Sequence, residues 1–352
     1  MTSRVTVLMT VYNGQAYLAE AIESVLTQSF RDFEFLIIDD ASTDGSVALI
    51  RSYADARIRL LSNPQNLGQN PSLNIGLKEA RGEIVVRIDQ DDMCLPGRID
   101  KQVRYLDEHP DVAVVGSWAY SIDEHTVKRT VWKWRVRDFG ELAGLFLVGR
   151  CALLHPAVAY RRAVICEAGG YDQTYAIASD YALWIDVMLR GHRAAVIEEP
   201  LSMYRVHGGR QSATKAHKHW EDTVRAHEKL LATLLPASDL RLAGSLLRIE
   251  PGVWEQHLSK KELTDLIESV DRILKNSGAV LGLKSAEVVS LSRTVYKWLG
   301  PGVTVARKMD WCPPMIVRGI FFGLSPLLIP GMRKFVTRVL DGLRPLRFLL
   351  RA

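Results

Sequence analysis

Phe33-Glu-Phe-Leu-Ile-Ile-Asp-Asp-Ala-Ser-Thr-Asp-Gly-Ser46 passes from an apolar run into a cluster of acids and then into the start of a helix. The apolar part, Phe33–Ile38, is typical of a buried strand, and the helical pattern of Ser46–Tyr53 follows it closely. Strands and helices in alternation are the repeating unit of a parallel sheet that helices cover on both faces. This stretch therefore predicts an α/β protein.

The same alternation extends through the first third of the chain. Strands are also predicted at Val5–Val11, Ile58–Leu61, Ile84–Ile88 and Val112–Gly116, and helices at Ala16–Thr27, Asn70–Ala80 and Pro96–Glu108. In such sheets, ligands bind beyond the carboxyl ends of the strands. Three polar clusters lie at such ends, namely Thr10–Gly14, Asp39–Ser46 and Asp89–Asp92. We expect them to line one crevice.

Composition narrows the class of protein. The chain has 352 residues and a formal net charge of +5, and most of the excess positive charge lies in its C-terminal tail, so we expect no nucleic-acid partner. The four cysteines, Cys94, Cys151, Cys166 and Cys312, have neither zinc-ligand nor disulfide-framework spacing. The first residues run straight into the strand Val5–Val11 without a signal-peptide pattern, which predicts a cytoplasmic catalytic part.

Asp89-Gln90-Asp91-Asp92 directly follows a predicted buried strand. Its carboxylates are hard oxygen ligands that suit Mg²⁺ or Mn²⁺, with substrate phosphates completing the coordination shell. A cation there would stabilise the charge of a departing diphosphate. A solvated acidic turn is the alternative for this pattern taken alone.

Three acids in Asp39–Asp44 exceed the single residue that a helix N-cap uses. A carboxylate at this strand end is well placed to accept hydrogen bonds from a ribose or a base. Thr10 and Tyr12, at the end of the first strand, are expected to line the same crevice.

Together these stretches resemble glycosyltransferase family 2, whose members are inverting nucleotide-sugar transferases of GT-A fold. The resemblance spans roughly the first 210 residues. It rests on Val7–Gly14, Leu26–Phe30, Ile37–Ser46, Asn66–Gly68, Asn74–Gly76, Ala80–Glu83, Asp89–Asp92, Pro96–Arg98, His155–Pro156, Gly169–Asp172, Ser179–Trp184 and Tyr204–His207. It implies a Rossmann-like, mostly parallel sheet flanked by helices, with a C-terminal helical extension.

The resemblance also implies roles for individual residues. The nucleotide-sugar is expected to contact Thr10, Tyr12, Asp39, Asp40, Asn66 and Asp89. The metal ligands are expected to be Asp89, Asp91, Asp92 and, as in similar transferases, His207. The neighbouring Arg205 and Arg210 could approach the phosphates, although loop arginines are ordinarily solvated.

Asp180 is the general base that the resemblance implies, taking a proton from the acceptor hydroxyl. From the residues alone it reads as an ordinary acid at the start of the helix Tyr181–Arg190. The family commonly has Glu-Asp where this chain has Ser179-Asp180, so the aspartate is kept and the supporting glutamate is missing. Around it, residues 150–212 show less regular patterns, with a loop at Tyr204–Ser212.

The chain then changes character. We expect a GT-A catalytic domain at 1–212, with a nucleotide-sugar half at 1–100 and an acceptor half at 101–212, a helical extension at 213–310 and a basic amphipathic tail at 311–352. In Arg333–Ala352, apolar residues share one helical face and arginines surround it, which is typical of a helix lying on an anionic membrane. The alternative is a helix packed on the protein's own core.

The sequence therefore predicts a metal-dependent, inverting glycosyltransferase that uses a UDP-sugar and a glycan or lipid-linked acceptor in surface polysaccharide or glycolipid biosynthesis. We expect it to be peripheral on the cytoplasmic face of the membrane. The main alternative is a catalytically silent nucleotide-sugar-binding subunit that acts through its helical C-terminal region. A retaining enzyme on the same fold is a second one.

Overall fold

The computed structural model describes residues 3–210, 214–235, 260–295 and 297, with only the backbone for 260–267. These residues belong to one compact unit, Met1–Thr304. The predicted tail at 311–352 and Cys312 lie outside the described residues. The boundary at residue 212 stays a prediction of the sequence. Within the described part, no helix combines the length and the apolar character that crossing a bilayer needs.

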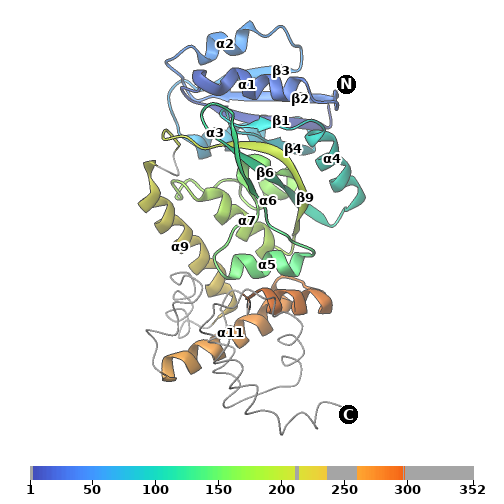
Figure 1. The fold of residues 1–352 in the computed structure, drawn as a ribbon, viewed down its shortest axis with the longest axis vertical. Coiled ribbons are helices and arrows are strands. Elements are labelled where there is room, and N and C mark those ends of the chain that lie inside the picture. Colours follow the sequence, from blue (N-terminus) through green and yellow to red (C-terminus); the bar gives the residue numbers. More distant parts are fainter. Residues whose placement is uncertain (1–2, 211–213, 236–259, 296, 298–352) are drawn as a thin grey trace. The chain divides into compact units, whose positions relative to one another are not determined.

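Figure 1 shows strands and helices alternating through the N-terminal half of the chain. After β9, the described residues form helices and no strand. The elements up to β6 are β1 (Val5–Val11), α1 (Gln15–Leu26), β2 (Phe33–Asp39), α2 (Ser46–Ser52), β3 (Ile58–Ser62), α3 (Gln69–Glu79), β4 (Ile84–Arg87), β5 (Met93–Cys94), α4 (Arg98–Glu108) and β6 (Val112–Ile122). Those that follow are β7 (Lys128–Trp132), α5 (Phe139–Leu147), a 3₁₀ turn (His155–Ala157), β8 (Ala159–Arg161), α6 (Arg162–Glu167), α7 (Ser179–Leu189), β9 (Arg193–Arg205), α9 (Ala216–Leu234) and α11 (Lys260–Val280). Residues 285–295 form a further helix.

The strands form one sheet in the order β3-β2-β1-β4-β8-β6-β9-β5, with β7 paired to β6. The strands of the N-terminal half, β3, β2, β1 and β4, are parallel, and β8 joins them antiparallel. Together with a likeness to solved structures described below, this arrangement confirms the predicted α/β fold of GT-A type. The helical extension predicted after it is present as α9 and α11.

Alternation along β1 explains why helices cover both faces. Val5, Val7, Met9 and Val11 pack with α1, α2 and α4 on one face, while Leu8 packs with α3 on the other. Because successive side chains of a strand point to opposite faces, an all-apolar strand needs cover on both sides. Every residue of β1 and of β2 is accordingly buried.

Strand register brings the polar ends together. Val11 of β1 lies beside Asp39 of β2, and Asp39 lies beside Ser62 of β3. The parallel strand β4 ends at Arg87, just before Asp89. The carboxyl ends of four parallel strands thus meet at one edge of the sheet, which is where this fold class binds ligands.

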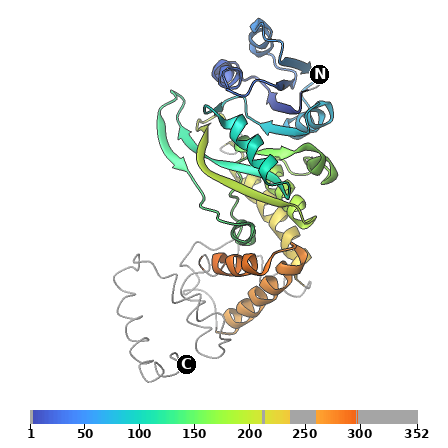
Figure 2. The same ribbon diagram turned by 90° about the vertical axis from the view of Figure 1, so that its right-hand side faces the viewer.

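Residues 101–212, which the sequence analysis predicts to be the acceptor half, depart from the predicted secondary structure. Arg193–Arg205 is one long strand, β9, where the sequence predicts irregular structure and a loop from Tyr204. It runs parallel to β6, side by side with it in Figures 1 and 2. The register between the two strands shifts near Pro200, which pairs with Trp118. Proline inside a sheet occurs mainly at edge strands and at bulges, where the register shifts. Because Pro200 interrupts the strand pattern, the sequence analysis did not recognise β9.

The C-terminal helices pack directly on residues 101–212, the predicted acceptor half. Helix α9 contacts α7 and α5, and α11 contacts α9. The 285–295 helix lies so close to α5 that a Cβ on Gly140 would fall 2.0 Å from the Glu287 carbonyl oxygen. Asp138, the N-cap of α5, also accepts a hydrogen bond from the Ser290 hydroxyl at 2.6 Å.

This contact predicts a reversed sign for Gly140→Ala. In a helix, replacing glycine by alanine ordinarily stabilises a protein by roughly 0.4–1 kcal/mol. Here the new methyl group meets backbone that cannot rotate away, so we expect destabilisation of about 1–3 kcal/mol, measured by thermal unfolding. Gly208→Ala is the control, since no atom lies within 4 Å of its added Cβ. A Gly140→Ala protein as stable as the native one would contradict this packing.

Candidate active site

Asp89–Asp92, here called the acid loop, follows β4 at the sheet edge. The amide of Gln90 anchors it to the end of β1, because its Oε1 accepts from the Tyr12 N–H at 2.8 Å and its Nε2 donates to the Tyr12 carbonyl at 3.2 Å. A Cβ at Gly14 would lie 2.4 Å from this amide oxygen, which explains the glycine. Gln90 thus replaces a neighbouring peptide group and fixes the loop against the first strand.

The three acid-loop carboxylates form a compact group. Asp89, Asp91 and Asp92 each offer an oxygen, and these atoms lie within 4.8 Å of one another. Burial raises the pKa of Asp91, and the charge of Asp89 raises it further. Burial, followed by the charges of Asp91 and Asp89, raises the pKa of Asp92 well above its usual value. The surroundings therefore do not compensate the negative charges that Asp91 and Asp92 carry when they are ionised.

Asp89 is the acid that the protein itself compensates. Desolvation acts to raise its pKa, but the charge and hydrogen bond of the fully buried Arg87 help to outweigh it, and the net pKa is lowered. The same guanidinium lies near His155, whose pKa falls to about 3 through burial first and this positive charge second. His155 is therefore neutral at physiological pH and hydrogen-bonds the Tyr171 hydroxyl at 2.9 Å.

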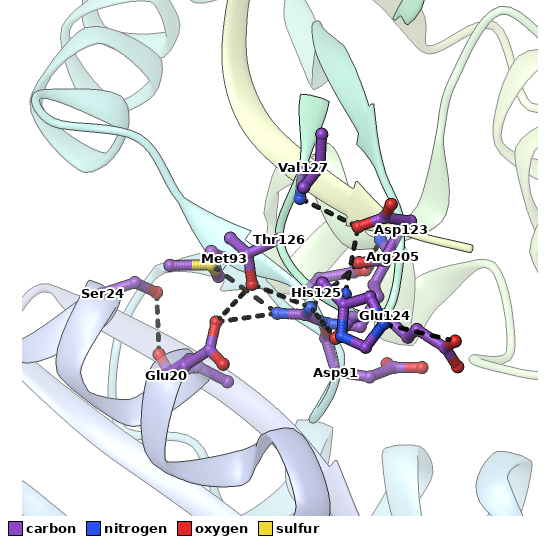
Figure 3. Close-up of polar contacts among 12 residues, drawn as sticks. Glu20, Ser24, Asp91, Met93, Asp123, Glu124, His125, Thr126, Val127 and Arg205 are labelled. Carbon is purple, nitrogen blue, oxygen red and sulfur yellow. Dashed lines mark hydrogen bonds and ion pairs between the residues drawn. The ribbon is translucent and has the colours of Figure 1, made fainter. Parts of the chain in front are cut away.

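Arg205, the last residue of β9, ties the acid loop to the rest of the site (Figure 3). Its guanidinium is fully buried, so the expectation that it is a solvated loop arginine is wrong. Its backbone N–H donates to Asp92 Oδ1 at 2.8 Å. The side chain donates to the acid loop, to the β6–β7 turn and to α1, at Asp91 O (3.0 Å), Asp123 O (3.1 Å), Glu124 O (3.3 Å), Thr126 Oγ1 (3.0 Å) and Glu20 Oε2 (2.9 Å).

His207 lies at the acid loop as expected. Its Nε2 hydrogen-bonds Asp91 Oδ2 at 2.9 Å, and its ring lies 5.0 Å from that of Tyr17, centroid to centroid. The group of side chains whose ligand atoms lie within 4.8 Å of one another consists of Asp89, Asp91 and Asp92, without His207. The imidazole therefore holds Asp91 in this structure, and its role as a metal ligand stays a prediction.

The donor set at the acid loop fits a divalent cation. Among the described residues, Asp92 Oδ2 is a buried carboxylate oxygen without a hydrogen-bond partner. A buried anionic oxygen is costly unless a cation or donor compensates it. Carboxylate oxygens in a cluster of excess negative charge are the ligands that Mg²⁺ and Mn²⁺ prefer.

At the end of β2, the two adjacent acids have different surroundings. Both oxygens of Asp40 are engaged, by the side chain of Asn63 at 2.8 Å and the backbone N–H groups of Leu67 and Gly68 at 2.9 and 2.8 Å. The Asp39 carboxylate accepts one bond in the described part of the chain, from the Ser42 N–H at 3.2 Å. Asp40 therefore holds the 63–68 segment in place, and Asp39 has the capacity to accept from a ligand.

The third acid of this region is structural. Asp44 accepts from the N–H groups of Gln15 and Ser46 at 3.1 and 3.0 Å, which satisfies two donors at the starts of α1 and α2. Hydroxyl groups assist it, since Ser42 and Ser46 accept from the N–H groups of Asn13 and Gly14. These bonds join the ends of β1 and β2 into one rigid edge.

The remaining donor-side predictions lie at the same edge. Thr10 is nearly buried near the end of β1, paired with Ile38. Tyr12 follows β1 with 46% of its surface exposed, and its backbone holds Gln90 as described. Asn66 is exposed in the segment that Asp40 holds.

Asp180 is the second residue of α7 and is half-buried. Desolvation raises its pKa, and the negative charge of Asp89 contributes to the rise. The Asp180 carboxyl therefore lies within electrostatic reach of Asp89 in the acid loop. Its neighbour Ser179, at the position of the missing glutamate, is buried and donates to Asn70 Oδ1 of α3 at 2.7 Å. A neutral hydrogen bond thus joins this position to residues 1–100, the predicted nucleotide-sugar half, here called the donor half.

Sequence reasoning missed Arg87, and it missed the structural roles of Gln90 and Arg205. Gln90 bonds Tyr12, which lies far away in the chain, and Arg205 ends a strand that was not predicted, so no local pattern marks these two residues. The one available signal is Arg87 itself, a charge inside an otherwise apolar strand next to three acids, since a buried charge needs a partner.

Comparisons with known proteins identify the family and support the fold. The model of Glycosyl transferase family 2 matches residues 6–168. An uncharacterised glycosyltransferase of Methanocaldococcus jannaschii is 32% identical over 206 residues, which cover 57% of this chain and 70% of that protein. The UDP-Gal:α-D-GlcNAc-diphosphoundecaprenol β-1,3-galactosyltransferase of Escherichia coli is 25% identical over 211 residues, covering 57% and 73%. S. aureus TarS 1–349 with UDP-GlcNAc superposes with a TM-score of 0.57 at 18% identity, covering 88% of each chain, which supports the fold.

The raised pKa of Asp91 predicts that Asp91→Asn raises the melting temperature of the metal-free protein. A carboxyl whose pKa is higher in the folded state than in the unfolded chain loses stability as the pH rises through that interval. At neutral pH, removing the charge therefore stabilises the fold, as measured by thermal unfolding in a chelator. Asp44→Asn is the matched control with the opposite sign, because the pKa of Asp44 is lowered. A lower melting temperature for Asp91→Asn would contradict the electrostatic assignment.

Proposed function

This chain belongs to glycosyl transferase family 2, and on that premise we propose that it transfers a sugar from a UDP-sugar to an acceptor hydroxyl with inversion. The observation that carries the proposal is the acid-loop cluster at the sheet edge shared with Asp39. Relatives act in polysaccharide and glycolipid biosynthesis, and the E. coli relative carries UDP-Gal in its name. These names favour UDP as the nucleotide.

Metal dependence follows from the donor set. Asp89, Asp91 and Asp92 are proposed to hold Mn²⁺ or Mg²⁺, with His207 as a further ligand. When bound, the cation neutralises charge that develops on the departing nucleoside diphosphate. Arg205 keeps the backbone of the acid loop in place, and Asp39 accepts a hydrogen bond from the nucleoside.

Asp180 is proposed as the general base. In a single displacement at the anomeric carbon, the acceptor hydroxyl attacks from the face opposite the leaving diphosphate, so the configuration inverts. The hydroxyl proton passes to the Asp180 carboxylate, and its raised pKa makes this group a stronger base than an exposed aspartate. We therefore expect transfer to need Asp180 in its ionised form and to fall at acidic pH.

A thermal-shift panel tests the donor site without knowledge of the acceptor. A ligand that binds only the folded protein raises its melting temperature with the logarithm of the ligand concentration over its Kd. We expect UDP with Mn²⁺ to stabilise the protein, and UDP in a chelator, or GDP, dTDP and CMP with Mn²⁺, to stabilise it less. Asp91→Asn should abolish the Mn²⁺-dependent part. A panel without any response would overturn the assignment of a nucleotide-sugar site.

We place the reaction on the cytoplasmic face of a membrane, with a glycan or lipid-linked acceptor. Support comes from the sequence of Arg333–Ala352, whose arginines surround an apolar helical face. Deleting these residues is expected to move the protein from the membrane pellet to the supernatant after centrifugation of vesicles that contain anionic lipid. The matched control keeps the tail and replaces its arginines by glutamines. Equal pelleting of the native and deleted proteins would refute membrane binding by the tail.

A further inference from the structure

Asp180 takes its position from the segment that leads into α7, residues 172–178. This segment has turns and bends but no helix or strand, so repeating backbone hydrogen bonds do not hold it. Asp172, Gln173, Thr174 and Ala176 are exposed. Backbone of this kind keeps one conformation only through contacts with neighbouring elements.

One of these neighbours is the donor half. Asn70 of α3 donates to the carbonyl of Tyr175 at 2.6 Å and accepts from the Ser179 hydroxyl at 2.7 Å. Both bonds flank the entry into α7. The donor half therefore holds one side of the segment.

Helix α9 holds the other side. Asp222 Oδ2 accepts a hydrogen bond from the backbone N–H of Ile177 at 2.9 Å. Arg225, one turn further on, donates to the Thr174 carbonyl at 2.6 Å, and its guanidinium carbon lies 4.0 Å from the centroid of the Tyr175 ring. Two side chains on one face of α9 thus contact the segment at Thr174, Tyr175 and Ile177.

The burial of Asp222 shows how firmly this contact is built. Only 1% of the residue is exposed, on a helix face that continues with the buried Ala226 and Leu230. A carboxylate placed there would be costly without donors, and its donors are the Ile177 N–H, with Arg225 and Lys218 at 3.4 and 3.6 Å. An apolar residue would cover this face at lower cost if packing were the sole requirement.

We propose that Asp222 is a positioning residue for the transfer reaction, which acts by fixing the backbone three residues before Asp180. The inference rests on the proposed role of Asp180 as general base. Helix α9 lies beyond the region that the family model covers, residues 6–168, so an element outside the matched region sets the geometry of the reacting carboxylate. Arg225 supports the same segment from the following turn.

The electrostatics of Asp180 point to the same helix. Desolvation dominates the pKa of Asp180 and raises it, while the imidazole of His219, also on α9, acts to lower it. His219 lies one turn before Asp222 on the helix. Helix α9 therefore reaches the base both through hydrogen bonds to its segment and through charge.

The test measures turnover and nucleotide binding separately in the full-length protein. Turnover is followed as release of nucleoside diphosphate from the sugar nucleotide. Because a shift of the reacting group by about 1 Å can lower a rate about a hundredfold, we expect Asp222→Ala to lower kcat by about tenfold or more. The Kd for UDP with Mn²⁺ should stay within about twofold of the native value, since the donor site lies on other elements. Asp222→Asn keeps an oxygen that accepts from Ile177 and should stay within about threefold of the native kcat.

Glu221→Ala is the matched control. It removes the same charge from the neighbouring position, where the carboxylate is half-exposed and pairs only with Lys218 and His217 among the described residues. Its kcat should equal that of the native protein. A native kcat for Asp222→Ala, or equal losses for Asp222→Ala and Asp222→Asn, would overturn the proposal.

Two further variants keep the outcome decisive. If Asp222→Ala does not fold, Arg225→Ala decides, because it removes the bond to Thr174 from a half-exposed site, and an unchanged kcat would overturn the proposal. Asp180→Asn separates this inference from the proposed function. Activity that survives Asp180→Asn refutes the general base, whereas loss in Asp180→Asn with native kcat in Asp222→Ala refutes only the positioning role.

Discussion

Three carboxylates whose oxygens lie within 4.8 Å of one another are the constraint on which the rest of the site depends. Two unit charges about 4 Å apart repel by roughly 4 kcal/mol at the effective dielectric constant found near protein surfaces. A loop of four residues cannot hold such a group by itself. The surrounding structure therefore supplies two fully buried arginines, Arg87 at the end of β4 and Arg205 at the end of β9.

The two arginines compensate the cluster in different ways. Arg87 pairs with the Asp89 carboxylate, and the pKa of Asp89 is lowered although desolvation acts to raise it. Arg205 instead donates a hydrogen bond to the backbone of the loop. Its other N–H groups donate to the β6–β7 turn and to α1. The backbone is fixed, yet the ionised forms of Asp91 and Asp92 are left uncompensated. The site is thus organised in advance of the proposed cation, and preorganised electrostatic sites avoid reorganisation during a reaction.

The donor half could be predicted from sequence because its signals are local. Apolar strands such as Phe33–Ile38 end in polar clusters within a few residues, and parallel topology brings those ends together. The acceptor half resists this method. Glu198-Glu199-Pro200 interrupts the alternation of β9 at the place where its register with β6 shifts, so the strand reads as loop. The contacts that matter, Arg205 with Asp92 and Asp222 with Ile177, join distant parts of the chain and leave no periodic pattern.

The division of work between adjacent acids shows the same limit at the smallest scale. Asp39 and Asp40 are equivalent in sequence, and the resemblance assigns the nucleoside to either. Their backbones differ because Asp39 ends β2, while Asp40 precedes Ala41, whose φ of +61° turns the chain into the left-handed region. The Asp40 carboxylate accepts its hydrogen bonds from the 63–68 segment. A non-glycine residue in that conformation costs about 1–2 kcal/mol, and the bonds of Asp40 hold the strained turn in place while Asp39 stays available to a ligand.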